Sequence, residues 1–99
     1  MIKENDILVH CEYGYGLHVD FYKVVKVTAK QIKITKVRAE KVNNERGTFY
    51  IPTGELVADV YHEAGVIRTI KKADCFWLDG MSLEKYVSPI KEYIYSMYA

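Results

Sequence analysis

The sequence predicts a mainly β domain that ends in one helical segment. Several short stretches before residue 80 are rich in β-branched and aromatic residues or alternate apolar with polar side chains, which is typical of strands. After residue 81 the apolar residues recur every three or four positions, which is typical of a helix. A chain of 99 residues forms one domain, with residues 1–80 as its β part and residues 81–99 as its helical part. About five short strands at this spacing predict a small antiparallel barrel of the SH3-like kind or a strongly bent sheet.

The clearest strand signals lie in the first part of the chain. Residues 6–11, DILVHC, are expected to form a short strand, and residues 20–28 and 31–37, DFYKVVKVT and QIKITKV, predict a β-hairpin. The doubled valine at positions 24 and 25 breaks the alternation, so we expect a β-bulge or strong coiling there. The hairpin should bury one face and expose the other, with Val25, Val27, Ile32 and Ile34 inside and Lys26, Lys33 and Thr35 outside.

Turn signals divide the rest of the β part. The sequences NNERG, at 43–47, and IPTGE, at 51–55, are expected to be loops because they are rich in turn-forming residues. Residues 56–72 predict a short hairpin in which Gly65 takes a positive φ. Residues 74–80, DCFWLDG, predict an apolar strand that ends at an Asp-Gly turn.

The last segment has the apolar spacing of one helical face. Pro89 is unfavourable inside a helix, so the helix is expected to restart there, with Ser88 as its N-cap. The apolar face is expected to pack on the sheet, and the alternative is a recognition stripe of Tyr86, Tyr93 and Met97. The positions that define the face are Leu83, Tyr86, Val87, Ile90, Tyr93, Ile94, Met97 and Tyr98.

Charge is unevenly distributed along the chain. The formal net charge of +1 argues against a strongly basic nucleic-acid coat and against an acidic DNA mimic. A basic hairpin side can still steer a partner, whereas lysines on exposed strands also serve simply to keep edges soluble. Between residues 21 and 42 only Glu40 opposes the basic residues Lys23, Lys26, Lys30, Lys33, Lys36, Arg38 and Lys41.

The sequence contains no 18-residue apolar run and no charged start followed by an apolar signal segment. The protein is therefore expected to be soluble, without membrane contact, in the cytoplasm of a cell. Cys11 and Cys75 are expected to be free thiols in that reducing compartment.

The sequence shows no catalytic motif. The glycines of YGYGLH lack the strand–loop–helix context of a phosphate-binding loop, and no histidine stands in a known nucleophile motif. His10 and Cys11 are adjacent, so on a strand they would point to opposite faces and could not hold one metal ion. His18, His62 and the cysteines could converge on zinc only through the fold, at a spacing unlike a zinc finger or ribbon. No catalytic residue, metal site or cofactor is therefore expected.

Parts of the sequence resemble a known family. The stretch YGYGLHVDFYKVVKVTAKQIKI, the later CFWLDG and the terminal YSMYA are similar to small proteins of bacterial phages and mobile elements. Those proteins share an aromatic-Gly-Tyr loop, a strand of the VDFYQVVKV type and a WDGKP … WYA ending. Here Met81 replaces the usual Lys-Pro, and the terminal segment is longer. The family carries no assigned activity, so the resemblance implies a setting in a bacterial host cell rather than a mechanism.

In that setting we expect a non-enzymatic binding protein. Its partner would be a host protein or a ribonucleoprotein, as for an anti-CRISPR-like inhibitor of a bacterial defence nuclease. Tyr13, Tyr15 and Leu17 lie among glycines in a loop that can present aromatic rings outward, and tyrosine is common at binding hot spots. Alternatively, these tyrosines cap the open end of a barrel.

Nucleic-acid binding is the competing function. Lysines of the basic hairpin would contact phosphates while Tyr13, Tyr15 or Tyr22 stack on bases. A third class of function is an enzyme whose site is assembled across the fold. A homodimer is also compatible with the sequence. The residues expected to bind the partner are Tyr13, Tyr15, Leu17, Tyr22, Lys26, Lys33 and Lys36.

Overall fold

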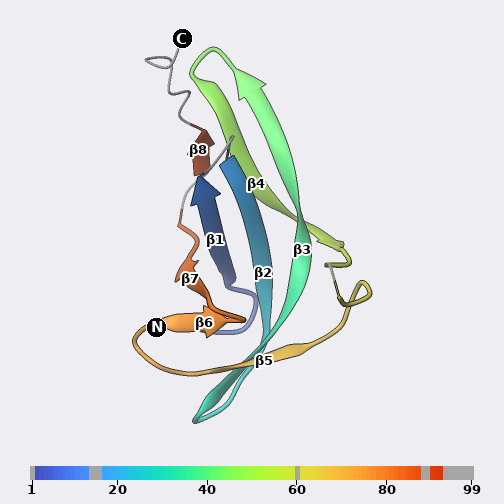
Figure 1. The fold of residues 1–99 in the computed structure, drawn as a ribbon, viewed down its shortest axis with the longest axis vertical. Helices are drawn as coiled ribbons and strands as arrows, with labels where there is room; N and C mark the ends of the chain where they lie inside the picture. Colours follow the sequence, from blue (N-terminus) through green and yellow to red (C-terminus); the bar gives the residue numbers. More distant parts are fainter. Residues whose placement is uncertain (1, 14–16, 60, 88–89, 93–99) are drawn as a thin grey trace.

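The fold is an antiparallel sheet (Figure 1). The computed structural model describes residues 2–13, 17–59, 61–87 and 90–92. Seven strands follow one another in the order β6-β7-β1-β2-β3-β4-β8, and β5 pairs with β3 beside this path. The strands are β1 (Ile7–Tyr13), β2 (Leu17–Val27), β3 (Gln31–Asn44), β4 (Gly47–Leu56), β5 (Arg68–Lys71), β6 (Phe76–Leu78), β7 (Met81–Lys85) and β8 (Ile90–Glu92).

Both faces of the central strands carry buried apolar residues, because successive side chains of a strand point to opposite faces. Leu8 lies opposite Tyr22 in the β1–β2 ladder, and the next pair is Val9 opposite Phe21. These two pairs belong to two separate clusters. The first contains Leu8, Tyr22, Val24, Ile32, Ile34, Ile70, Leu78 and Leu83, and the second contains Val9, Val19, Phe21 and Val37.

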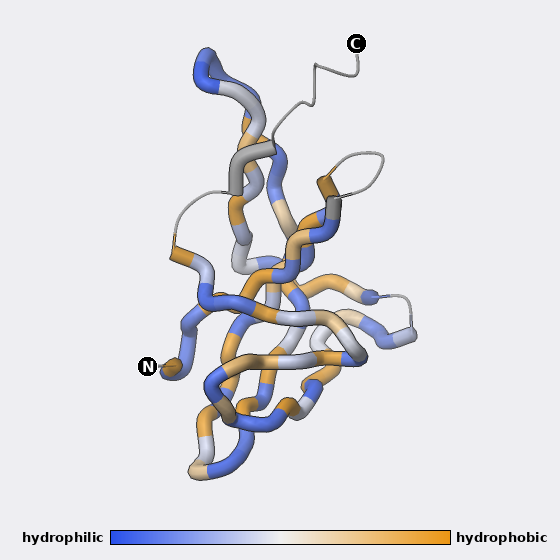
Figure 2. The backbone as a smooth tube through the Cα atoms, turned by 60° about the vertical axis from the view of Figure 1, so that its left-hand side comes forward, coloured by the Kyte–Doolittle hydropathy of each residue, from blue (hydrophilic) through white to orange (hydrophobic). Residues whose placement is uncertain are grey.

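The first cluster joins the central strands to the segments that follow β4. Ile70 of β5, Leu78 of β6 and Leu83 of β7 are each buried against it. Hydrophobic and hydrophilic segments alternate along the strands, and the tip of the β3–β4 hairpin is hydrophilic (Figure 2). The core therefore lies at the middle of the sheet, and the β3–β4 hairpin extends beyond it (Figure 1).

The hairpin predicted over residues 20–37 is confirmed, as is the bulge. The β2–β3 register shifts between Val24 and Lys26, so Val25 is the extra residue of the bulge. The bulge reverses the expected face of this residue: Val24 is fully buried, whereas Val25 is 40% exposed. Thr35, expected outside, is also buried, and its hydroxyl donates to the Val66 carbonyl at 3.0 Å.

Two of the predicted turns are confirmed. Asn44 and Gly47 close the β3–β4 hairpin, which confirms the turn expected at 43–47. The turn between β6 and β7 is also confirmed, with positive φ at Asp79 (49°) and Gly80 (83°), as a two-residue hairpin turn requires. Gly65 has the positive φ expected of it, 85°.

The predicted barrel is wrong, and so are the loop predicted at residues 51–55 and the hairpin predicted over residues 56–72. Residues 51–55 belong to β4, where Ile51 pairs with Glu40 and Pro52 with Ala39, and the strand is irregular only after that point. The hairpin expected over residues 56–72 does not form, because β5 pairs with the first residues of β3 instead. The sheet is consequently not closed into a barrel.

The helix predicted from residue 81 is wrong within the described residues. Residues 81–85 form β7 and residues 90–92 form β8. Leu83 belongs to the first cluster and Tyr86 packs against the second, so apolar residues three apart serve two opposite faces. The same spacing on a helix would place them on one face. Ser88, Pro89 and residues 93–99, where the helix was expected to restart and continue, lie outside the described residues.

Candidate functional site

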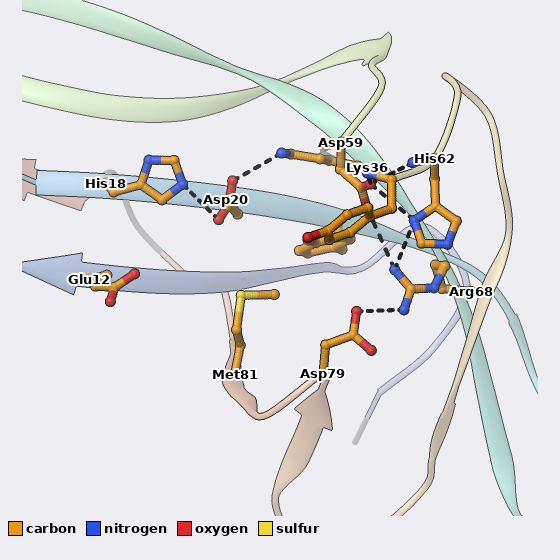
Figure 3. A pocket seen from close by; sticks show the side chains of 11 residues that line it. Glu12, His18, Asp20, Lys36, Asp59, His62, Arg68, Asp79 and Met81 are labelled. Carbon is orange, nitrogen blue, oxygen red and sulfur yellow. Dashed lines mark hydrogen bonds and ion pairs between the residues drawn. The ribbon is translucent and has the colours of Figure 1, made fainter.

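A cavity of about 330 Å³ opens on the face that carries the first cluster (Figure 3). We call it the charged cavity. Its floor comes from β1, β2 and β3, and its walls come from the loop after β4, from β5 and from the β6–β7 turn. Its lining residues are Glu12, His18, Asp20, Tyr22, Lys36, Asp59, Tyr61, His62, Arg68, Asp79 and Met81.

Strand periodicity places the floor residues together. His18, Asp20 and Tyr22 alternate along β2, so they share one face. Glu12 lies opposite His18 in the β1–β2 ladder, and Lys36 lies opposite Tyr22 in the β2–β3 ladder. The apolar face of the central strands thus becomes polar toward the β1–β2 turn.

Asp20 is the buried centre of the floor, with a side chain only 9% exposed. Lys36 Nζ lies 3.1 Å from Asp20 Oδ1, and His18 Nε2 lies 3.0 Å from Asp20 Oδ2. Each carboxylate oxygen therefore has its own nitrogen partner, which is what a buried charge requires.

A second ion-pair network forms the wall. Arg68 Nη2 lies 2.6 Å from Asp79 Oδ2, and Arg68 Nη1 lies 3.6 Å from Asp59 Oδ2. Burial acts to raise the pKa of Asp59. Hydrogen bonds from the backbone N–H of Tyr61 and from His62 outweigh it and hold that pKa below its usual value.

Tyr22 has a buried ring but an unpartnered hydroxyl. Only 3% of the residue is exposed, and within the described part of the chain its hydroxyl makes no hydrogen bond. No fully buried side-chain polar atom of the described residues lacks a partner, so this hydroxyl opens into the charged cavity. Burial, together with the charges of Asp20 and Asp59, raises the pKa of Tyr22 to about 12, and the hydroxyl stays protonated at neutral pH.

The charged cavity is acidic overall. Four carboxylates line it against two permanently cationic groups, which leaves a formal charge of minus two while its two histidines are neutral. Both cationic groups, on Lys36 and Arg68, are already paired with carboxylates. Tyr61 also lines the cavity and is 89% exposed, so its ring stands at the rim.

The residues predicted to bind a partner lie in different parts of the structure. Tyr22 and Lys36 lie in the charged cavity. Leu17 pairs with Tyr13 at the end of the β1–β2 ladder and packs against the second cluster, and Tyr15 lies outside the described residues. Leu17 therefore lies on the face opposite the charged cavity, whose floor includes its neighbour His18.

The other two predicted lysines belong to a separate lysine cluster. Lys26 pairs with Lys33 across the β2–β3 hairpin, Lys71 pairs with Gln31, and the backbone N–H of Lys72 donates to the Lys30 carbonyl at 2.9 Å. No ion pair to these lysines occurs among the described residues. The lysine cluster consists of Lys26, Lys30, Lys33, Lys71 and Lys72.

Both cysteines are free, as expected. Cys75 is exposed, whereas burial and the charges of Glu84 and Asp20 raise the pKa of Cys11. His10 Nδ1 lies 2.9 Å from the Ser82 carbonyl oxygen, while Cys11 packs against the second cluster, so the two neighbours do point to opposite faces. Within the described ranges no group of three or more histidine, cysteine or acidic side chains is placed to hold a metal ion.

The charged cavity was not predicted from the sequence, although the spacing of its floor residues could have indicated part of it. Glu12 and His18 flank the tyrosine-glycine loop symmetrically, and Asp20 follows His18 by two positions, a spacing that puts polar groups on one face of a hairpin. The wall residues Asp59, Arg68 and Asp79 reach the cavity only through long-range pairing, which has no such local signal.

In the part of the chain that the structure describes, no helix has the length and apolar character needed to cross a membrane. Comparisons of the chain with protein-family models, with curated proteins and with solved structures find no match.

Proposed function

We propose that the protein is a non-enzymatic binding protein that engages a protein partner through the charged cavity. The observation that carries the proposal is the composition of this surface: an exposed tyrosine beside a partly buried network of opposite charges. Interfaces concentrate binding energy in such aromatic anchors, and their charges fix orientation.

The family resemblance supplies the setting. A protein of this kind in phages or mobile elements would act in a bacterial host cell on a host protein or ribonucleoprotein, such as a defence nuclease. The acidic charge of the cavity favours protein over nucleic acid at this surface, because four carboxylates repel phosphates. Leu17 packs against the second cluster, on the face opposite the charged cavity, so it lies outside this proposed surface.

Site-specific cross-linking tests the proposal. With the photoreactive p-benzoylphenylalanine in place of Tyr61, irradiation of bacterial host lysate should give a discrete protein adduct that survives nuclease treatment. The same group in place of Glu45, at the tip of the β3–β4 hairpin, serves as the matched control and should give no such adduct. Against the captured partner, Tyr61→Ala should weaken binding by about 1–3 kcal/mol, the loss typical of an aromatic anchor. Adducts that appear equally from both positions, or that nucleases remove, would contradict the proposal.

The lysine cluster favours nucleic acid as a second candidate partner. Five lysines without an ion pair in the described structure gather at one end of a nearly neutral domain, and phosphate backbones bind such groups. Two basic residues of the predicted hairpin do not contribute, since Lys36 is paired with Asp20 and Arg38 with Glu55.

Fluorescence anisotropy with a single-stranded oligonucleotide tests this second candidate. Lys26→Gln combined with Lys33→Gln should weaken binding and reduce the slope of log affinity against log salt by about 0.7 for each phosphate that the variant no longer neutralises. Lys85→Gln, which removes a lysine paired with Asp6 instead, is the control and should leave the slope unchanged. Binding that does not respond to the lysine pair would eliminate the candidate.

A further inference from the structure

The charged cavity has the size and the chemistry of a ligand site. Its volume of about 330 Å³ lies at the lower end of the range of small-molecule sites, so it fits a small group rather than a cofactor. Its formal charge of minus two attracts cations, and an anion would meet no free positive group there because Lys36 and Arg68 are both paired.

Hydrogen-bond acceptors remain available in the cavity. Glu12 has a 71% exposed side chain, and its only ion pair among the described residues is a 4.0 Å approach to His10. Asp79 uses one oxygen for Arg68, and within the described structure its other oxygen makes no hydrogen bond. A cation with several N–H donors could therefore bind without breaking the existing pairs.

The Tyr22 hydroxyl is a second and independent sign of a ligand. It belongs to a residue that is only 3% exposed, it faces the cavity, and no described residue accepts its proton or donates to it. A nearly buried polar group of this kind is normally paired, and here the remaining partner must come from the cavity.

We infer that the charged cavity binds a guanidinium group, and that an arginine side chain of the protein partner supplies it. A guanidinium is flat, weakly hydrated and carries five N–H donors, so it suits dispersed acceptors and an aromatic rim better than a compact ammonium does. The Tyr61 ring at the rim offers the face on which such a cation stacks. The inference that a partner's arginine supplies the guanidinium rests on the proposed function, whereas the inference that the cavity binds a guanidinium does not.

Titration with L-argininamide tests the recognition. Saturable shifts in the amide spectrum of the ¹⁵N-labelled protein should map to the residues of the cavity in the millimolar range. L-Citrullinamide, which has the same shape without the charge, should bind at least about tenfold more weakly. Absence of saturable shifts, or equal binding of the two amides, overturns the inference.

Matched variants locate the binding. Tyr22→Phe removes only the unpartnered hydroxyl, so it should leave thermal unfolding unchanged and weaken argininamide binding about tenfold. Glu12→Gln should weaken it about fivefold, whereas Glu84→Gln, which removes an exposed carboxylate outside the cavity, should have no effect. Wild-type binding by both Tyr22→Phe and Glu12→Gln overturns the inference.

Competition between argininamide and the partner protein tests whether the partner supplies the guanidinium group. Saturating argininamide should suppress the protein adduct formed from position 61 in host lysate. An adduct that persists unchanged while argininamide is bound overturns the assignment to a partner's arginine. Argininamide binding in the absence of any protein adduct supports guanidinium recognition and refutes only the proposed function.

Discussion

The free energy of unfolding should fall by about 3–5 kcal/mol when Phe21 is replaced by alanine. Phe21 is fully buried at the centre of the second cluster. Its ring meets that of Tyr86 edge to face, with centroids 5.3 Å apart and planes at 85°, a geometry that adds to the burial energy. Domains of this size are marginally stable, so the loss removes a large share of the total. Urea unfolding followed by far-UV circular dichroism measures it.

Two comparisons isolate the cause of that loss. Phe21→Leu keeps most of the buried volume and should lose clearly less than Phe21→Ala. Tyr61→Ala removes a larger side chain from an exposed position and should change stability by no more than about 0.5 kcal/mol. A loss below about 1 kcal/mol for Phe21→Ala would show that the second cluster does not hold the sheet together.

Local signals in the sequence predicted the central hairpin and two turns, although the loop expected at residues 51–55 belongs to β4. The doubled valine at positions 24 and 25 located the bulge because two adjacent apolar residues cannot share one face of a regular strand. Asp79 and Gly80 predicted their turn because few other residues tolerate positive φ. These features depend on residues within a few positions of one another.

Features that depend on distant segments were not predictable in the same way. The path of β5 is set by its pairing with β3, more than thirty positions away, as in the pair Lys33 and Thr69. The segment after residue 81 looked helical because Leu83 and Tyr86 are three apart. That spacing also fits an extended chain whose two sides meet two different clusters. Whether this segment forms a helix or a strand depends on the sheet against which it packs.

The charged cavity likewise has a part that local sequence signals could predict and a part that they could not. The floor could have been assembled from the hairpin register, which places Lys36 beside Tyr22 and close to Asp20. That register explains why Lys36, expected as a free cation for a partner, is held by a carboxylate instead. The wall could not have been assembled, because Arg68 joins Asp59 and Asp79 from two separate segments.

Asp20→Ala should lower the free energy of unfolding by about 3 kcal/mol. Without Asp20, the Lys36 ammonium loses its partner at 3.1 Å while its side chain is only 22% exposed, and an unpaired buried charge is strongly destabilising. The expected value lies at the lower end of the range for a broken buried pair, because that remaining exposure lets water reach the ammonium. Urea unfolding at neutral pH measures the loss.

A double-mutant cycle separates the stranded charge from the packing that Asp20 supplies. Lys36→Met removes the ammonium while keeping a chain of similar length, so the double variant Asp20→Ala with Lys36→Met should recover more than about 1 kcal/mol of what Asp20→Ala loses. His18, the other partner of Asp20, has a 67% exposed side chain and needs no replacement, since water can solvate it. If the double variant is as unstable as Asp20→Ala, the loss comes from packing. If Asp20→Ala itself loses less than about 1 kcal/mol, the ion pair between Asp20 and Lys36 does not stabilise the fold as expected.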